Sequence, residues 1–414
     1  MANDRIIVFN PYTHHSYQTA YGLQQAGMLD RLLTAFYYKP HSPWWAWLRS
    51  LPPLSRARAE RYLGRRNLAG LDEALVSHLP LFALLDYAIE RTPALRARLS
   101  QARRWKLEWV ERWAGRIVAA RRPKAVIGHD IACLETFRAA KAAGVICILD
   151  QTTGYLEAAL RIFAEEKRLQ PDFAEDLEVQ DPAWVFPHAR AELALADWVL
   201  APSDYVRDTL LPLGVAPERI VKLPYGVDTG RFVPRPGGSE VGERHGRFRL
   251  LYVGRLSQRK GIKYLLEAVK RLGLPEIELT LIGAVAGSGR GLQNYAGLYH
   301  HIPYVPHKEI QRHFQEADLF VFPSLHEGSA LVVFEALASG LPVITTPNSG
   351  SVVRDGVDGF IVPIRDVGAL AAKIALLYND RTRISGMRQN ARARAEEHSW
   401  RHYHERLAGW LAGL

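Results

Sequence analysis

Short apolar runs alternate with amphipathic stretches of helical spacing along this chain. RIIVF, KAVIGHD, GVICILDQ, ADWVLAPSD and RIVKLPYGVD in the first half each have the pattern of a buried strand that ends in polar residues. The pattern starts again with FRLLYVG, IELTLIG, LFVFPS and PVITT, and helical stretches such as YLLEAVKRL and LVVFEALASG lie between these strands. Strands that alternate with helices predict parallel sheets covered by helices on both faces. We therefore expect an α/β protein with two doubly wound, Rossmann-like domains.

The segment between the two series of strands is rich in glycine, proline and charge. Residues 233–246, VPRPGGSEVGERHG, are therefore the expected linker. It separates an N-terminal domain of residues 1–232 from a C-terminal domain of residues 247–396. Residues 397–414 are amphipathic and are expected to form a helix that packs back on the first domain. We expect residues from about 42 to 124 to form a basic, helical insertion in the first domain.

Charge sets that insertion apart from the rest of the chain. The chain has a formal net charge of +10, and residues 31–124 contain 19 Lys and Arg against 7 Asp and Glu. Such a field attracts phosphate groups of nucleic acid, anionic lipid or sugar nucleotide. Trp44, Trp45 and Trp47 lie within it, which favours contact with an anionic membrane surface. The alternative is a charged insertion whose Trp side chains are buried.

Composition and termini indicate a cytoplasmic protein. An apolar share of 48% with 23% charged residues is typical of a globular chain and excludes a disordered one. MANDRIIVF lacks the apolar stretch of a secretory signal, and no window contains the ~18 apolar residues of a spanning helix. Cys133 and Cys147 have apolar neighbours, which favours buried reduced thiols. We expect a cytoplasmic location, with peripheral attachment to the inner face of the membrane.

The segment PSLHEGSALVVFEALASGLPVIT carries the strongest chemical signal. Glu327 follows a buried strand, and Glu335 comes eight positions later inside the next helix. The small residues 328–330 let backbone N–H groups approach an anion, and the helix beginning near Leu331 adds its unpaired amides. Such a loop can hold a diphosphate, with the carboxylates binding hydroxyls on either side of it. The alternative is a solvated helix with a capping Glu.

A second signal lies in LLYVGRLSQRKGIKYLLEAV. The strand ends at Gly254, and Arg255 and Lys260 follow within one loop. An Arg side chain can bind two phosphate oxygens at once, and a Lys supplies a point charge. Ligands bind at the carboxyl ends of strands in open α/β sheets, which favours phosphate binding over simple solvation here.

Together these segments resemble the donor signature of glycosyltransferase family 4. The likeness extends back through DWVLAPSDYVRDTLLPLGVAPERIVKLPYGVDTGRFVP and includes KAVIGHD. Members are retaining, metal-independent enzymes of the GT-B fold, so the resemblance implies two facing Rossmann-like domains with a C-terminal helix returning to the first. It implies that Arg255 and Lys260 hold the donor diphosphate. Glu335 would bind the ribose hydroxyls, and Glu327 the transferred sugar.

The same resemblance supplies the full set of expected donor and catalytic residues. His129 ends KAVIGHD, where the family usually carries a His that faces the donor sugar, and Asp130 is expected to orient it or to cap the following helix. The expected catalytic residues are His129, Arg255, Lys260 and Glu327. The expected donor-binding residues are Gly254, Arg255, Lys260, Tyr304, Val305, Glu327, Gly328, Ser329, Ala330, Leu331 and Glu335. Around Tyr304 and Val305, a plain turn in IPYVP is the alternative.

The chain departs from the family after its first strand. It has NPYTHHSYQT where many relatives have a Gly-Gly pair, and the loop after HEG continues Ser-Ala-Leu. The residues expected to contact the acceptor are Asn10, His14, His15, Asp130 and Asp150. For Asn10, His14 and His15 the alternatives are contact with phosphate or simply the filling of a bulkier loop. No metal site is expected at the His pair, because adjacent side chains usually diverge and a third ligand is missing. The acidic run AEEKRLQPDFAEDLEVQD is expected to be a solvated helix and loop.

The expected reaction is attack of an acceptor hydroxyl on the anomeric carbon of a UDP-, GDP- or ADP-sugar, with retained configuration. Loop cations and helix amides would stabilise the leaving diphosphate, so this hexosyltransferase would need no cofactor and no metal. A glycan or lipid-linked acceptor in polysaccharide, glycolipid or cell-envelope synthesis fits a basic, Trp-bearing domain. The alternatives are a sugar-nucleotide epimerase or a phosphorylase. Nucleic-acid binding is not expected, since no recognised motif is present.

Overall fold

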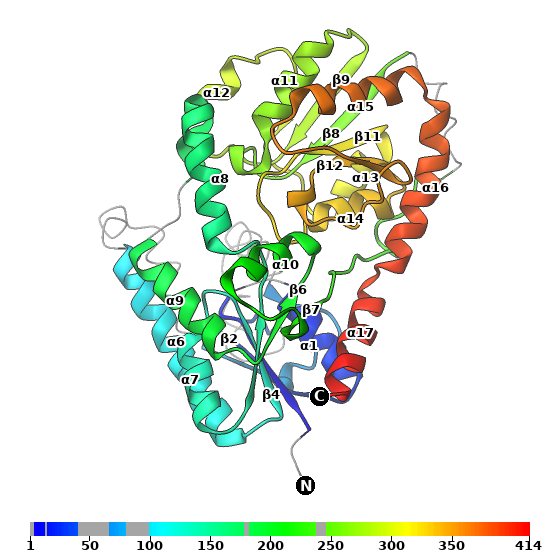
Figure 1. The fold of residues 1–414 in the computed structure, drawn as a ribbon. Coiled ribbons are helices and arrows are strands. Elements are labelled where there is room, and N and C mark those ends of the chain that lie inside the picture. The colour runs from blue at the N-terminus through cyan, green and yellow to red at the C-terminus, as the bar shows by residue number, and fades with distance from the viewer. Residues whose placement is uncertain (1–3, 13–14, 40–65, 80–98, 178–181, 237–245) are drawn as a thin grey trace, which may run out of the picture.

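The computed structural model describes residues 4–12, 15–39, 66–79, 99–177, 182–236 and 246–414. His14 and the cluster of Trp44, Trp45 and Trp47 lie outside these described residues. The described chain folds into two α/β domains, one above the other in Figure 1. Within the described residues, no helix combines the length and the apolar character needed to cross a membrane.

The N-terminal domain contains a parallel sheet of seven strands in the order β3-β2-β1-β4-β5-β6-β7. Alternate residues of β1 serve opposite faces, since Ile7 and Phe9 join one apolar core while Ile6 and Val8 join the other. Both faces are therefore covered, as the continuous apolar runs predict. The strands are β1 (Ile6–Phe9), β2 (Leu29–Thr34), β3 (Val76–His78), β4 (Ala125–His129), β5 (Ile146–Asp150), β6 (Trp198–Ala201) and β7 (Ile220–Lys222). The helices are α1 (Ser16–Gln25), α6 (Leu99–Arg121), α7 (Leu134–Ala142), α8 (Leu156–Leu169), α9 (Pro182–Leu195) and α10 (Asp204–Leu210).

The C-terminal domain contains a second parallel sheet, with six strands in the order β10-β9-β8-β11-β12-β13. One large apolar core surrounds it, and Phe320 and Phe322 of β11 stack within that core. The strands are β8 (Phe248–Val253), β9 (Ile277–Ile282), β10 (His300–Ile302), β11 (Leu319–Phe322), β12 (Val343–Thr345) and β13 (Gly359–Ile361). The helices are α11 (Ile262–Leu272), α12 (Arg290–Gln293), α13 (Ile310–Glu316), α14 (Leu331–Ala338), α15 (Val367–Asn379) and α16 (Thr382–Glu397).

The chain returns to the first domain at its C-terminus. After α16, the hydroxyl of Ser399 caps α17 (Trp400–Ala412) by accepting from the amide of His402. Helix α17 packs on α1, where the hydroxyls of Tyr403 and Thr19 lie 2.8 Å apart. Figure 1 shows α16 and α17 running down one side of the molecule from the second domain to the first. This confirms the predicted return of the C-terminal helix.

One expectation for the first domain is met only in part. Much of the acidic run after β5 is an exposed helix and 3-10 turn, as expected, but Glu166 of α8 is fully buried and Phe173 joins the core of the C-terminal domain. Residues 171–176 form a 3-10 helix, η3 (Pro171–Asp176), that continues from α8. The burial of Glu166 was not predictable, because its partners Gln258, Tyr264 and Arg365 are distant in the sequence, as described below.

Candidate functional site

Each sheet reverses its strand order at one point, and the expected site residues follow the strands at these points. In the first sheet the reversal lies between β1 and β4, and in the second between β8 and β11. Open α/β sheets bind ligands outside the carboxyl ends of the strands at such points. The loops after β5 and β11 meet between the domains, where the amide of Gly154 donates to the carbonyl of Glu327 at 3.1 Å. The two carboxyl edges therefore face each other.

Three expected residues of the N-terminal domain form one buried cluster. Nε2 of His15 lies 2.7 Å from Oδ2 of Asp150, and Nε2 of His129 lies 3.3 Å from the same oxygen. His129 and Asp150 end β4 and β5 and are paired in register, which places both at the sheet edge. Burial lowers the pKa of His15 to about 3, so its imidazole is neutral and donates to the carboxylate. Nδ1 of His129 lies 3.2 Å from the carbonyl of Phe9, which can only accept, so this nitrogen carries a proton.

The sequence predicts no metal site at His14 and His15, because no third ligand lies near them in the sequence. In the structure the fold brings His129 and Asp150 beside His15. The donor atoms of these three residues lie within 4.8 Å of one another, as those of metal ligands do. Glu111, His188 and Glu192 form another such group among the described residues. In each group a direct hydrogen bond joins two of the side chains, His15 to Asp150 in the first and His188 to Glu111 in the second.

Asp130 has neither of the two roles expected for it. Its carboxylate accepts from the amide and hydroxyl of Thr152, at 3.2 and 2.7 Å, and from the side-chain amide of Gln151 at 3.1 Å. Helix α7 begins after Cys133, without a side-chain cap. Asp130 instead holds the loop after β5, and Asp150 is the carboxylate beside His129. Burial raises the pKa of Asp130 to about 7, against the opposing effect of the Thr152 hydrogen bonds.

Asn10 shapes the loop after β1 and is itself buried. Its side-chain amide donates to the hydroxyl of Ser16 at 3.3 Å, and its Oδ1 accepts from the amide of Tyr12 at 2.8 Å. The ring of His15 packs on the ring of Tyr225 with a centroid separation of 4.0 Å. Asn10 and His15, two of the residues expected to contact the acceptor, are thus buried and do not form an open surface.

On the opposite domain, Lys260 and Glu327 form an ion pair across the two loops of the reversal point. Burial lowers the pKa of Lys260, while the nearby carboxylate of Glu327 opposes that effect. Nζ of Lys260 also lies 5.3 Å from the centre of the Phe322 ring. Arg259, which the sequence patterns did not single out, lies with its Nε 3.7 Å from Oε1 of Glu327. A doubly cationic loop therefore faces this carboxylate.

The loop after β8 is shaped by close backbone contacts. Gly261 has a φ of 72°, and a Cβ there would lie 1.9 Å from the carbonyl oxygen of Pro323, so only glycine fits. Arg255 is exposed, and its backbone carbonyl accepts from the hydroxyl of Tyr252 at 2.8 Å. The amide of Gly254 bonds to the carbonyl of Ile282. The side chain of Arg255 therefore lies at the edge of the site, free of the packing that fixes Lys260.

The small residues after Glu327 let the domains approach closely. A Cβ on Gly328 would lie 1.7 Å from the carbonyl oxygen of Thr152, and the hydroxyl of Ser203 donates to the carbonyl of Gly328 at 2.5 Å. The amide of Ala330 was expected to line a phosphate, but it already donates to the carbonyl of Ser349 at 3.1 Å. Ser329 is buried. Helix α14 begins at Leu331 without a side-chain cap, as an anion site at a helix N-terminus requires.

Glu335 lies on α14 and has a partner that the sequence did not indicate. Nε2 of His307 is 3.3 Å from Oε1 of Glu335. His307 belongs to the loop after β10, which also contains the exposed Tyr304 and the half-buried Val305. The structure thus places the loop of the expected nucleobase residues beside the carboxylate expected to bind ribose. The strand β10 ahead of that loop was not predicted, because its HHI sequence is short and polar at its start.

His326, directly before Glu327, fixes the donor loop to the first domain. The hydroxyl of Tyr205 lies 2.7 Å from Nδ1 of His326, and the backbone carbonyl of His326 accepts from Nε of Arg259 at 3.0 Å. Burial and the nearby positive charge of Arg259 lower the pKa of His326 to about 3. A neutral His326 can therefore accept from Tyr205 across the whole ordinary pH range.

Comparison with known proteins agrees with this architecture. Residues 247–380 match the family model described as "Glycosyl transferases group 1". The chain is 31% identical over 172 residues to the amylovoran biosynthesis glycosyltransferase AmsK of Erwinia amylovora, which covers 37% of this chain and 41% of AmsK. It is 32% identical over 239 residues to D-inositol 3-phosphate glycosyltransferase 1 of Catenulispora acidiphila, covering 52% of this chain and 57% of that protein. These matches therefore span about half the length of the relatives.

The likeness to solved structures covers both domains. HepE of Anabaena, solved in complex with UDP, superposes with a TM-score of 0.62 at 15% identity and covers 99% of this chain and 100% of that one. The same protein has also been solved with UDP-glucose. At this identity the likeness concerns the fold, which is GT-B, as expected.

Proposed function

We propose that this protein is a glycosyltransferase that transfers a sugar from a nucleoside diphosphate sugar to an acceptor hydroxyl. The observation that carries the proposal is the ion pair of Lys260 and Glu327 at the strand-order reversal of the second sheet. A cation there suits a diphosphate, and a carboxylate beside it suits sugar hydroxyls. Both residues lie within the segment that matches the glycosyltransferase family model.

The proposed mechanism retains configuration and uses no metal. The bond between the anomeric carbon and the phosphate oxygen breaks, the acceptor oxygen bonds to the same face of that carbon, and its proton passes to the leaving phosphate. Lys260, Arg255 and the N-terminus of α14 supply positive charge where the diphosphate leaves. His129 ends β4 at the facing edge and would contact the transferred sugar.

For the donor, we propose that Glu335 binds ribose hydroxyls and that the loop of Tyr304 and Val305 passes near the base. The contact between Glu335 and His307 supports this, since it brings that loop beside the carboxylate. HepE, which shares the fold, was solved with UDP and with UDP-glucose. UDP-sugars are therefore the first donors to test, followed by GDP- and ADP-sugars.

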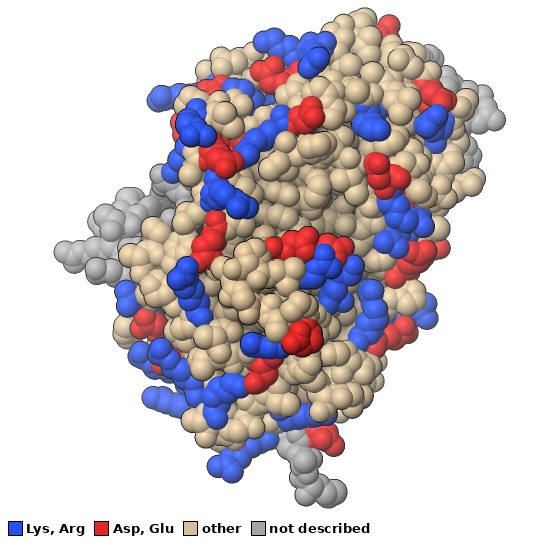
Figure 2. All heavy atoms as spheres, viewed as in Figure 1, with Lys and Arg blue, Asp and Glu red and all other residues tan. Residues whose placement is uncertain are grey.

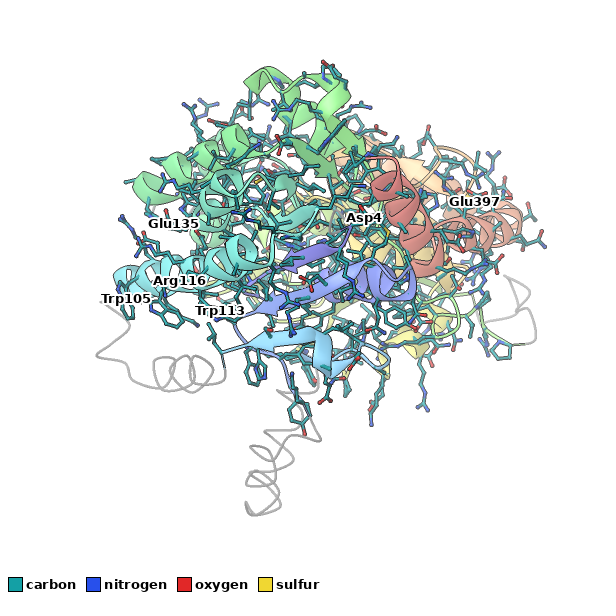
Figure 3. The ribbon with its side chains drawn as sticks, turned by 90° about the horizontal axis from the view of Figure 1, so that it is seen from below. Asp4, Trp105, Trp113, Arg116, Glu135 and Glu397 are labelled. Atoms are coloured by element: carbon teal, nitrogen blue, oxygen red, sulfur yellow. The ribbon has the colours of Figure 1, made fainter. Side chains whose placement is uncertain are left out.

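For the acceptor, we propose a glycan or lipid-linked molecule at an anionic membrane surface. On α6, Trp105 and Trp109 are 60% and 38% exposed. Arg112 and Arg116 are exposed and continue the same helical stripe, at spacings of three and four residues. Figure 3 shows Trp105 and Arg116 along α6, at the outer edge of the N-terminal domain. Trp and Arg side by side suit the boundary between lipid and water.

Nucleic-acid binding is not part of the proposal. On the face shown in Figure 2, Lys and Arg side chains are interspersed with Asp and Glu over both domains. Proteins that bind nucleic acid usually gather basic residues in one stripe or patch. The charge pattern of this face therefore suits small phosphorylated ligands better than a polyanion.

Two measurements test the proposal. In a thermal-shift screen, UDP, GDP or ADP and their sugars should raise the melting temperature, because they bind the native state. The sugar nucleotide that stabilises the protein should then be consumed only when an acceptor is present. Conversion to a different sugar nucleotide without acceptor and without release of nucleoside diphosphate would indicate an epimerase, and release of sugar phosphate from a glycan on adding phosphate would indicate a phosphorylase. No stabilisation by any nucleotide would contradict the donor site itself.

A further inference from the structure

Helix α8 and the 3-10 helix η3 leave the first sheet and lie against the second domain. Figure 1 shows α8 rising beside α11 and α12. Phe173 packs near Tyr295 in the core of the C-terminal domain, and a Cβ on Gly291 would lie 2.5 Å from the Phe173 ring. Nζ of Lys263 lies 2.9 Å from Asp172. This segment of the first domain is therefore fitted closely to the second.

Glu166 is the centre of this contact. Its carboxylate is fully buried and accepts hydrogen bonds from the hydroxyl of Tyr264 at 2.9 Å and from Nε2 of Gln258 at 2.7 Å. Nε of Arg365 donates to the same carboxylate. All three donors belong to the C-terminal domain. A buried carboxylate requires such partners, so the contact between the domains depends on these specific hydrogen bonds.

Gln258 connects this carboxylate to the donor loop. It begins the turn of residues 258–260 and is itself fully buried, with its side chain directed at Glu166. The same turn ends at Lys260, whose amide bonds to the carbonyl of Ser257 at 3.1 Å. The amide of Gly261 bonds in turn to the carbonyl of Gln258 at 2.8 Å. Fixing Gln258 therefore fixes the backbone that carries Lys260.

We propose that Glu166 is a positioning residue for the donor site, acting through Gln258 to hold the turn that carries Arg259 and Lys260. The N-terminal domain thus supplies part of the support of a binding loop that belongs to the other domain. The proposal rests on the function proposed above only in so far as Lys260 binds the donor diphosphate. The support of the turn by Glu166 can be measured without any ligand.

Hydrogen exchange in the nucleotide-free protein measures that support. Glu166→Gln removes the charge but keeps the size of the side chain, so the amides of Lys260, Gly261 and Ile262 should exchange about tenfold faster. Glu165→Gln is the matched control, because Glu165 pairs with Nη1 of Arg365 at 2.7 Å but not with Gln258. It should leave those three amides within about twofold of the parent.

Gln258→Met tests the same link from the other side. It removes the amide that reaches Glu166 and leaves Tyr264 and Arg365 in place, so it keeps the test open if Glu166→Gln does not fold. Gln258→Met should likewise increase the exchange rates of the amides of Lys260, Gly261 and Ile262. Unchanged exchange at Lys260 to Ile262 in every folded variant of the two positions would overturn the proposal.

Calorimetric titration with UDP, GDP and ADP separates this proposal from the proposed function. Where the parent binds one of them, Glu166→Gln should weaken that binding about tenfold and Glu165→Gln by less than about twofold. Equal binding by the parent and both variants would overturn a role for Glu166 in the donor site. If the parent binds none of the three nucleotides, the donor-site assignment is contradicted. Faster exchange of the turn in the Glu166→Gln variant would still support the link between Glu166 and the turn.

Discussion

The ammonium group of Lys260 is paired with the carboxylate of Glu327 in the ligand-free protein. Both groups are largely shielded from water, with side-chain exposures of 22% and 12%, so their attraction is stronger than that of a surface pair. A diphosphate that enters the site must therefore compete with Glu327 for Lys260. The carboxylate would then be released toward the hydroxyls of the transferred sugar.

The first prediction concerns charge at the leaving diphosphate. Lys260→Ala and Arg255→Ala should each lower kcat about 100-fold, because each removes a cation from the place where negative charge develops. Lys270→Ala, at the far end of α11, is a control that should retain near-parental rates. Steady-state kinetics on purified, folded proteins checks this. Near-parental rates in both of the first two variants would rule out the assignment of the donor site.

A second prediction separates the two carboxylates of the donor segment. Glu335→Gln should weaken the binding of free UDP as well as of the UDP-sugar, because ribose is common to both. Glu327→Gln should not weaken UDP binding, because it removes the carboxylate that competes with the diphosphate for Lys260, and it should lower the transfer rate by roughly 100-fold. Isothermal titration with UDP measures the first effect, and single-turnover transfer the second. The ribose role of Glu335 would be wrong if both variants bound UDP as the parent does.

Much of the fold was predictable because its strands are continuous apolar runs. The strands at the centre of each sheet, such as β1, β4, β8 and β11, are covered on both faces and have that pattern. Strand β2 was missed because Asp30 and Arg31 interrupt LDRLLT. Asp30 is nevertheless buried, since its carboxylate accepts two hydrogen bonds of 2.8 Å from Arg121. Such a partner, 91 positions away, cannot be read from local sequence.

The site likewise combines features that local sequence predicts with contacts between residues distant in the sequence. The spacing of Arg255, Lys260 and Glu327 along two strand ends was enough to predict that they share one edge. The pairing of His15 with Asp150 was not predictable, because the two residues are separated by 135 positions and meet only when β1 and β5 join one sheet. The role of Asp130 was misjudged because Asp130 directly follows His129 in the sequence. In the structure its carboxylate accepts hydrogen bonds from Gln151 and Thr152, in the loop after β5.

A third prediction follows from the proposal that loop cations replace a metal. Activity should persist within about twofold after treatment with EDTA, because Lys260 and Arg255 already neutralise the leaving diphosphate. Transfer rates before and after chelation check this, with protein that has been passed through a desalting column as the control. Activity that disappears with EDTA and returns with Mn²⁺ or Mg²⁺ would contradict the proposal. The cluster of His15, His129 and Asp150 would then be the first place to look for the ion.

The fourth prediction concerns pH and a buried histidine behind the site. Nε2 of His188 lies 3.1 Å from Glu111 and 3.2 Å from Glu192. Glu192 in turn accepts from the amides of Ile131 and Cys133, in the loop after His129. Burial disfavours the charged imidazole, but the hydrogen bonds to the two carboxylates outweigh it and raise the pKa of His188 to about 9.

Because the pKa of His188 in the folded state lies above its unfolded value of about 6.5, protonation stabilises the fold. That contribution, on the order of 3 kcal/mol, should be complete below pH 6.5 and should be lost as the pH rises through 9. Urea unfolding of the parent and of His188→Gln at several pH values measures it. The difference between the two proteins should shrink toward pH 9, whereas the exposed His300→Gln should show no such trend. A difference that stays constant with pH would contradict the charged state of His188.

The last prediction tests the membrane surface proposed for the acceptor. The exposed stripe of Trp105, Trp109, Arg112 and Arg116 should bind vesicles that contain anionic lipid, and added salt should weaken that binding. Each cation near an anionic surface contributes about 1 kcal/mol, and Trp favours the interface itself. Trp44, Trp45 and Trp47 lie outside the described residues and could add to the same binding.

Flotation with liposomes measures the effect of the α6 stripe separately from that of Trp44, Trp45 and Trp47. Replacing Trp105 and Trp109 together by Ser should reduce the fraction that floats with anionic vesicles at low salt by at least about threefold. Tyr304→Ser is a suitable control, because Tyr304 is 50% exposed but lies on the other domain, away from α6. Replacing Trp44, Trp45 and Trp47 by Ser measures the second group in the same assay. If the parent floats with neither neutral nor anionic vesicles at low salt, the α6 stripe is not a membrane-binding surface. The acceptor would then have to reach the cleft from solution.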